Sequence, residues 1–368
     1  MAPTASSRIL LTGATGYIGG SVLDALIKSP APSLTPVTFD VLVRRQDQAD
    51  KLHEAYGDRV EPVLWSGLND PAAVADIAAN YDLVVNAGLG FHPNGGKPFV
   101  EGLARGAQKG NGRVPWILHL SGCTNLADRP ITGETFPDRA WDDADAKAVY
   151  EFMRKEEEKE RYSQRTNEVD VLAAAEESGV HALSLNASMI FGEGKGLLTK
   201  NGGVLPLTMS FILKHGYGFK FNETAGIDWV HIEDLADLWV LIVRAILERP
   251  DRGVGYILSG TNGIVFPSVG RIRNEELMME DDTPKTKEIR LLALEEAAAE
   301  ITGGAVDLME RGWAGNKNLK GTAARRLFGW NPTRLREALD RELREQVELL
   351  QGSGFDVQDV MKSSTGLK

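Results

Sequence analysis

The sequence predicts an α/β protein in which a doubly wound parallel sheet carries a smaller, mainly C-terminal α/β lobe. Two observations predict this class. Short apolar runs rich in β-branched residues alternate with helical stretches over the first 125 residues, which is typical of β-α-β units. Each run has five or six residues, the length expected of a strand buried on both faces of a sheet.

The first half of the sheet can be placed from these runs. A helix is expected over Tyr17–Ser29 and another over Pro98–Lys109, because both stretches carry helical patterns between strand-like runs. The strands are predicted at Arg8–Thr12, Thr38–Val43, Val60–Leu64, Asp82–Asn86 and Trp116–Leu120.

The pattern changes after the fifth strand. Residues 128–161 contain turns, an acidic cluster and a charged run, and are interpreted as an insertion with an exposed helix. A long helix over Tyr162–Ser178 is then expected to stop at Gly179, because glycine readily ends helices. The later elements are predicted at Ala182–Asn186 (strand), Trp229–Ile232 (short return to the sheet), Asp234–Leu247 (helix) and Gly255–Leu258 (strand).

Glycines become frequent beyond Phe191, which suggests a mobile loop that crosses to another lobe. The chain beyond Pro267 is mostly helical in pattern. We therefore expect residues 1–190 and 225–262 to form the sheet domain and residues 191–224 and 263–368 to form the substrate-binding lobe.

Composition limits the classes of partner. A formal net charge of −11 is a poor basis for binding nucleic acid or an anionic membrane. Cys123 is the only cysteine, so an internal disulfide and a cysteine-based zinc site are excluded, and no other metal site is expected. No apolar stretch approaches the length of a membrane span. We expect a cytoplasmic enzyme that acts on a small molecule.

The sharpest motif lies between the first strand and the first helix. Gly13, Gly16 and Gly19 form a Gly-x-x-Gly-x-x-Gly turn. The first glycine permits the tight turn, the second lets backbone approach a pyrophosphate, and the third lets the helix pack closely on the sheet. This arrangement predicts a dinucleotide-binding (Rossmann) domain.

The end of the second strand indicates which dinucleotide is bound. An acidic residue there would bind a ribose 2′-hydroxyl, whereas an arginine can pair with a 2′-phosphate. The strand ends in Arg44 and Arg45. NADP(H) is therefore favoured as cofactor over NAD(H), unless both arginines form only a solvated strand end.

Further motifs resemble the extended short-chain dehydrogenase/reductase family, which includes NAD-dependent epimerases and dehydratases. They occur in the family's order over nearly the whole chain, and the acidic insertion is similar to an NmrA-like fungal branch. The motifs are Asn86-Ala87-Gly88, Leu120-Ser121-Gly122-Cys123-Thr124, the segment 186–192, Trp229-Val230-His231-Ile232-Glu233-Asp234, and the segment 324–332 that contains Gly329-Trp330-Asn331-Pro332.

The resemblance implies a catalytic Tyr-x-x-x-Lys pair, and here the chain departs from the family. Tyr162 occupies the tyrosine position, but Thr166 stands where the lysine is expected. Arg165 lies near the same helical face and could hold a developing anion, although it is a poor proton relay. The hydroxyl that orients the substrate is assigned to Ser121 or Thr124, with Cys123 as the third alternative for that position.

The resemblance also assigns the residues that line the two ligands. The cofactor is expected to contact Gly13, Thr15, Gly16, Tyr17, Ile18, Gly19, Arg44, Arg45, Leu68, Ala87, Gly88, Ser121, Tyr162, Ala187, Ser188 and Ile190. The substrate is expected to contact Leu89, Phe91, His92, Cys123, Met189, Phe191 and Trp229.

These features predict an NADP(H)-dependent oxidoreductase that acts on a ketone or alcohol of a small to medium metabolite, of aromatic or polyketide type. Two alternatives stay open. One is a sugar-nucleotide epimerase or dehydratase, and the other is a redox sensor or regulator that binds NADP(H) without catalysis. The resemblance also makes a homodimer an option.

Overall fold

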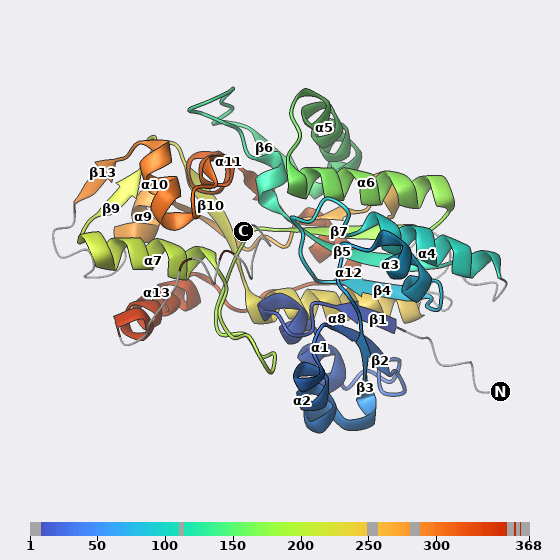
Figure 1. Cartoon of the computed structure of the whole chain (residues 1–368). Helices are drawn as coiled ribbons and strands as arrows, with labels where there is room; N and C mark the ends of the chain where they lie inside the picture. Colours follow the sequence, from blue (N-terminus) through green and yellow to red (C-terminus); the bar gives the residue numbers. More distant parts are fainter. Residues whose placement is uncertain are drawn as a thin grey trace.

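The main sheet of the computed structural model is parallel and has the order β11-β7-β5-β4-β1-β2-β3 (Figure 1). The structure describes residues 9–109, 114–248, 257–279, 288–351, 357 and 361. Its strands are β1 (Ile9–Thr12), β2 (Phe39–Val43), β3 (Val60–Leu64), β4 (Leu83–Asn86), β5 (Trp116–Gly122), β7 (His181–Ala187) and β11 (Ile264–Val265). This doubly wound arrangement confirms the predicted fold class.

Helices cover both faces of the sheet. One face packs on α1 (Tyr17–Lys28), α2 (Gln46–Tyr56), α8 (Ile232–Glu248) and α12 (Thr322–Phe328). The other face packs on α3 (Pro71–Ala78), α4 (Lys97–Gln108), α5 (Ala146–Lys159) and α6 (Ser163–Ser178). The strands between these layers are almost wholly buried, as their short apolar runs predict, except for the edge strand β3, of which only Val60 is buried.

A second lobe lies beside the carboxyl ends of the strands and has its own apolar core (Figure 1). Its helices are α7 (Val204–His215), α9 (Asn274–Met279), α10 (Leu294–Ile301), α11 (Val306–Met309) and α13 (Arg336–Gln351). Its small sheets join β8 (Met189–Phe191), β10 (Gly226–His231) and β12 (Gly270–Arg273), and pair β9 (Gly218–Lys220) with β13 (Ile289–Leu291).

The insertion is fastened to the C-terminal part of the chain. Strand β6 (Ala140–Asp142) pairs in parallel with β14 (Asn318–Lys320). The buried carboxylate of Asp143 accepts hydrogen bonds from the backbone N–H groups of Phe266, Thr322 and Ala323. The expected exposed helix is α5, but it buries one face, which includes Val149 and Met153.

The strand predicted over Gly255–Leu258 is not found in its described half. Gly255 and Tyr256 lie outside the described residues, and Ile257 and Leu258 are not in a strand. The edge of the sheet is completed instead by Ile264 and Val265, which pair with Ser184 and Leu185 of β7. A strand of two residues is too short to produce a periodic pattern.

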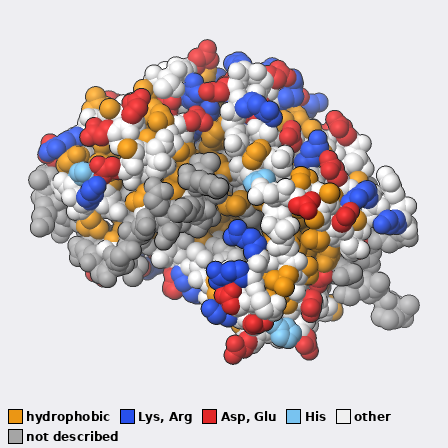
Figure 2. Space-filling model, viewed as in Figure 1, with side chains coloured by type: hydrophobic (Ala, Val, Ile, Leu, Met, Phe, Trp, Pro, Cys, Tyr) orange, Lys and Arg blue, Asp and Glu red, His pale blue; other side chains and the backbone are white. Residues whose placement is uncertain are grey.

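Charged side chains of both signs are interspersed over the face of the molecule seen in Figure 2. Within the described residues, no helix combines the length and apolar character needed to cross a membrane.

Candidate functional site: a dinucleotide turn beside a buried tyrosine

Close backbone packing requires glycine at two positions of the turn. Gly13 has a φ of 77°, and a Cβ atom there would lie 2.4 Å from the carbonyl oxygen of Ala87 at the end of β4. A Cβ atom on Gly19 would lie 2.3 Å from the carbonyl oxygen of Gly13. Side chains at either position would therefore push β1, β4 and α1 apart.

The start of α1 suits an anionic group. Gly16 precedes the helix, and no side chain caps its first N–H groups. Uncapped N–H groups and the helix dipole favour a phosphate at this end. A cradle built by side-chain-free backbone at the carboxyl end of β1 therefore fits the pyrophosphate of a dinucleotide.

A strap, defined here as residues 192–203, runs over this turn. The Tyr17 hydroxyl donates to the Gly192 carbonyl at 2.7 Å, and the Thr199 hydroxyl donates to the Thr15 carbonyl at 2.9 Å. A Cβ atom on Gly196 would lie 2.7 Å from Gly20. The glycines that we expected in a crossing loop thus permit contact between the strap and α1.

The two arginines after β2 differ in their surroundings. Arg45 forms an ion pair with Asp47 at 2.8 Å, and both side chains are exposed. Arg44 is exposed and has no ion pair within the described ranges, and its Cδ lies near the backbone of Gly67 after β3. Arg44 is therefore the arginine that is available to an added phosphate.

Tyr162 lies just before α6 and reaches the end of β5. Its hydroxyl donates to Thr124 Oγ1 at 3.0 Å, and the Thr124 hydroxyl donates in turn to Gln164 Oε1 at 2.5 Å. Phe91 packs edge-on against the tyrosine ring with centroids 6.0 Å apart. The structure thus joins three predicted site residues, Tyr162, Thr124 and Phe91, and adds Gln164.

Ser121 points into a buried polar network rather than toward Tyr162. Its hydroxyl accepts a hydrogen bond from Asn125 at 2.9 Å and is bonded to the carboxylate of Glu168. Glu168 also accepts from Ser184 and Asn186, at 2.7 Å each. Among the hydroxyls proposed from sequence, Thr124 is the one in contact with the tyrosine.

The same network extends to His119, on β5. Asn86 lies 3.0 Å from its Nδ1 and in turn accepts from Thr12 at 2.8 Å, while Glu168 lies 3.9 Å from its Nε2. Burial lowers the pKa of His119 to about 4, and burial raises the pKa of Glu168. The hydrogen bonds among these groups connect β1, β4, β5 and β7 beneath the site.

The Arg165 guanidinium is used up by contacts within the protein. It is 2% exposed, forms an ion pair with Glu157 at 3.1 Å, and donates to two backbone carbonyls of the preceding turn. Thr166, at the expected lysine position, donates its hydroxyl to the same Glu157 carboxylate. Neither residue offers a free cation to Tyr162.

A different arginine stacks on the tyrosine. The guanidinium carbon of Arg311 lies 4.6 Å from the centre of the Tyr162 ring, whereas that of Arg165 lies 5.9 Å away. Arg311 belongs to a π-helical turn (Glu310–Ala314) and is held by Asp307 and Glu160. The sequence offered no signal for this contact, because 149 residues separate the two side chains.

Charge and burial act in opposite directions on the tyrosine. Burial raises the pKa of Tyr162 above its ordinary value, and the Thr124 hydrogen bond and the charge of Arg311 pull it downward. Burial is the larger effect. The hydroxyl is therefore protonated at neutral pH and can act as a proton donor but not as a standing base.

The remaining predicted substrate residues fall into two groups. Leu89, Phe91 and His92 lie in the loop after β4, where His92 contacts Asn69 at 3.1 Å. Met189, Phe191 and Trp229 belong to the core of the second lobe, and Phe191 packs against Trp229 at 5.7 Å. Cys123 is buried beside Thr124.

The residues predicted to line the rest of the cofactor differ in burial. Ala187 ends β7 and Ser188 follows it, both are buried, and the Ser188 hydroxyl donates to the Pro267 carbonyl at 3.0 Å. Ile190 and Leu68 are partly buried. Among the described residues, no group of three or more metal-ligating side chains gathers anywhere.

Comparison with known proteins agrees with this geometry. Residues 148–254 match the model of the NAD dependent epimerase/dehydratase family, which confirms the resemblance seen in the motifs. The chain is 24% identical over 341 residues to "Oxidase ucsJ" of Acremonium sp, an alignment that covers 89% of this chain and 93% of the relative.

Solved structures share the fold. The dTDP-glucose 4,6-dehydratase DesIV of Streptomyces venezuelae, solved with NAD, superposes with a TM-score of 0.60 at 15% identity, covering 93% of this chain and 97% of that one. The yeast methylglyoxal/isovaleraldehyde reductase Gre2, solved with NADPH, gives 0.56 at 13%, covering 94% and 99%. At this low identity, the likeness shows that the chain shares the fold of these proteins.

Proposed function

We propose that the chain is an NADP(H)-dependent oxidoreductase that interconverts a ketone and an alcohol on a small to medium metabolite. The observation that carries the proposal is the Tyr162–Thr124 hydrogen bond, which sets a buried proton donor at the end of β5. The glycine turn at the end of β1 lies two strands away in the same sheet. Ligands of such sheets bind across these strand ends.

The chain's own residues would hold the cofactor as follows. The turn from Gly13 to Gly19 receives the pyrophosphate, Ala87 and Gly88 line its path along the strand ends, and Arg44 receives the 2′-phosphate. When bound, the nicotinamide supplies or accepts hydride. Because Arg45 is already paired with Asp47, selectivity for the phosphorylated cofactor rests on Arg44.

Each polar side chain near Tyr162 has a separate task. Tyr162 donates a proton to the substrate oxygen, and the Thr124 hydroxyl, which donates to Gln164 while the tyrosine is protonated, then rotates to donate to the phenolate that remains. Arg311 stabilises the same negative charge through the ring face. We therefore assign to Arg311 the role that the sequence suggested for Arg165, and Arg165 becomes a positioning residue for the start of α6.

The substrate is proposed to lie between the two lobes, with residues 191–224 and 263–368 contributing most of the second lobe. Phe91 on the sheet side is partly exposed and provides an aromatic wall, which is usual in small-molecule sites, whereas Phe191 is buried in the core of the second lobe. The Phe91 wall favours an aromatic or otherwise apolar substrate over a sugar.

The experiment pairs a substrate panel with two tyrosine variants. Aliphatic and aromatic aldehydes and ketones are screened by NADPH oxidation, and Tyr162→Phe is expected to lower turnover by about 100-fold or more while keeping NADPH affinity. Tyr150→Phe is the matched control, because Tyr150 is also buried but belongs to α5 and packs in the apolar core on that face of the sheet. Equal turnover of the two variants would refute the assignment of Tyr162.

Two other functions have a specific observation in their favour. The family model that matches residues 148–254 is named for NAD dependent epimerases and dehydratases, which favours the first alternative. A non-catalytic sensor is favoured by Thr166, which leaves Tyr162 without the family's lysine. Tight NADPH binding with no turnover over the whole panel, unaffected by Tyr162→Phe, would favour the sensor.

A further inference from the structure

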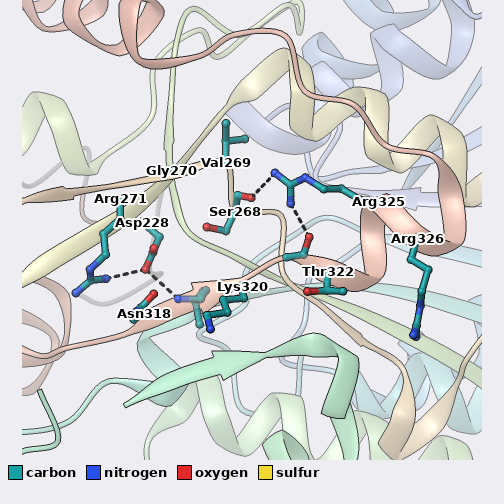
Figure 3. A pocket seen from close by; sticks show the side chains of 12 residues that line it. Asp228, Ser268, Val269, Gly270, Arg271, Asn318, Lys320, Thr322, Arg325 and Arg326 are labelled. Carbon is teal, nitrogen blue, oxygen red and sulfur yellow. Dashed lines mark hydrogen bonds and ion pairs between the residues drawn. The ribbon is translucent and has the colours of Figure 1, made fainter. Parts of the chain in front are cut away.

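A cavity that is open to solvent, with both polar and apolar atoms in its wall, lies away from the glycine turn. It has a volume of about 690 Å³ and is bounded by β10, β12, the segment 318–322 and α12 (Figure 3). It adjoins the β11 edge of the main sheet, four strand positions from β1. That separation is on the order of 20 Å, so one dinucleotide phosphate site does not account for both places.

Cations outnumber anions in the wall of this cavity. Arg271 is paired with the buried Asp228 at 2.9 Å, so this pair contributes little net charge. Lys320, Arg325 and Arg326 also line the cavity, and none of them forms an ion pair in the part of the chain that the structure describes. Three unpaired cations in one cavity contrast with the chain's net charge of −11.

Arg325 is held in place by neutral groups. Its guanidinium donates to the carbonyls of Gly321, at 2.5 Å, and Ser268, at 3.2 Å, and stacks over Trp330 at 5.1 Å. Figure 3 shows it reaching from α12 toward Ser268, with the Arg271–Asp228 pair at the opposite end of the cavity. The charge is therefore oriented without being neutralised, which is the arrangement that an anion-binding arginine needs.

Nearby carboxylates do not neutralise the cations of the cavity. Asp142 lies opposite Lys320 in the β6–β14 pair, but its side chain caps Ala144, and no ion pair joins it to Lys320. Asp143 occupies the N–H groups at the start of α12. A ligand would therefore be bound by the cations of the cavity wall and not by the N-terminus of α12.

We propose that this cavity binds a small organic phosphate through Lys320, Arg325 and Arg326. Its volume suits a nucleotide-sized ligand rather than a bare phosphate ion, since cavities of about 300–1,000 Å³ typically hold drug-sized molecules. Polar side chains at Asn318, Thr322 and Ser268 offer further hydrogen bonds to the ester part. The proposal does not depend on the oxidoreductase function.

Calorimetric titration at low ionic strength tests the site with inorganic pyrophosphate, AMP and coenzyme A as separate probes. The probes distinguish a bare diphosphate, a nucleotide and a phosphopantetheine compound. The variant Lys320→Ala/Arg326→Ala removes two exposed cations from the cavity, and the control variant Lys147→Ala/Lys155→Ala removes two exposed cations from α5, outside both the cavity and the glycine turn. Both variants should fold, because exposed side chains contribute little to stability.

We expect at least one organic phosphate to bind, with affinity lowered ten-fold or more by the cavity variant and less than two-fold by the control. Added salt should weaken the wild-type binding further. The proposal fails if no probe binds, if only pyrophosphate binds, or if the control variant loses as much affinity as the cavity variant. It also fails if the cavity variant, shown to be folded by circular dichroism, binds normally.

Discussion

The glycine turn and the tyrosine segment stand at the carboxyl ends of neighbouring parts of one sheet, but their geometry is fixed by different means. In the turn, backbone meets backbone, and Gly13 and Gly19 leave no room for a Cβ atom. Around Tyr162, side chains from α6, β5 and a distant turn meet one another. Backbone packing restricts residue type tightly, whereas a side-chain assembly can be rebuilt from other residues.

The largest expected effect lies in the turn. Gly13→Ala combines a positive φ with a Cβ atom 2.4 Å from the Ala87 carbonyl, so we expect a loss of about 3–4 kcal/mol in unfolding free energy together with loss of NADPH binding. Urea unfolding and fluorescence titration measure the two effects.

The variant Gly179→Ala separates the cost of a positive φ from the cost of a steric clash with a neighbouring residue. Gly179 has a similar φ of 72°, but nothing lies within 4 Å of a Cβ atom there. It should cost only about 1 kcal/mol and leave NADPH binding intact. Equal losses in both variants would show that backbone conformation alone, and not the contact with β4, governs the turn.

The second prediction concerns the network beneath the tyrosine. His119 has its pKa lowered to about 4 by burial, so the unfolded chain binds the extra proton first as pH falls. Stability should therefore be full above pH 6.5 and should decline by about 3 kcal/mol as pH falls to about 4. His119→Gln should lack this part of the decline in urea unfolding at stepped pH.

Carboxyl groups with raised pKa values act in the opposite sense. Burial raises the pKa of Asp143 and of Asp228 to about 6 and also raises that of Glu168, beside His119, which favours the folded state at low pH. Because all three groups are present in wild type and variant, those that do not contact His119 cancel in the comparison. Identical pH profiles for the two proteins would mean that His119 is not the residue whose protonation opposes folding.

The third prediction tests whether a distant side chain replaces the family's lysine. Arg311→Met removes a cation that stacks on Tyr162, and a loss of about 2 kcal/mol in transition-state stabilisation corresponds to about 30-fold in turnover. Its carboxylate partners, Asp307 and Glu160, are 44% and 47% exposed and are solvated when left alone.

Arg139→Met serves as the control, because Arg139 stacks over Phe136 at 3.8 Å, in the insertion. It should leave turnover unchanged. Arg311→Lys should recover part of the rate, and the pH profile of Arg311→Met should shift to higher pH relative to wild type. A rate loss in Arg311→Met that lysine does not relieve, with an unshifted pH profile, would reduce Arg311 to a structural residue.

The smallest expected effect concerns cofactor choice. Arg44→Ala should weaken NADPH binding by about ten-fold and leave NADH binding unchanged, because one charge-assisted contact is lost. Arg45→Ala should have less effect, since Asp47 already neutralises that arginine. Fluorescence titration with both nucleotides measures the ratio, and equal affinities of the wild type for NADPH and NADH would contradict the assignment.

These contrasts explain which parts could be predicted from sequence. Strand β3 lies at the predicted Val60–Leu64, and α1 ends one residue before its predicted limit, because both follow from local apolar patterns. The ion pair that keeps Arg165 from the site could not be predicted, because its partner Glu157 lies on another helix. Arg311 and the edge strand β11 depend on long-range contacts with no local pattern.

The contacts between the insertion (residues 128–161) and the segment around β14 affect when this part of the fold can form during synthesis. Asp128 accepts a hydrogen bond from Asn316 and Asp143 accepts from Thr322, so each contact spans about half of the polypeptide. During synthesis the insertion emerges long before its donors exist, and domains mature as their parts leave the ribosome. The part of the fold that carries the candidate site is therefore completed late, and shortening the chain ahead of residue 316 would remove the Asn316 donor from Asp128 and the Thr322 and Ala323 donors from Asp143.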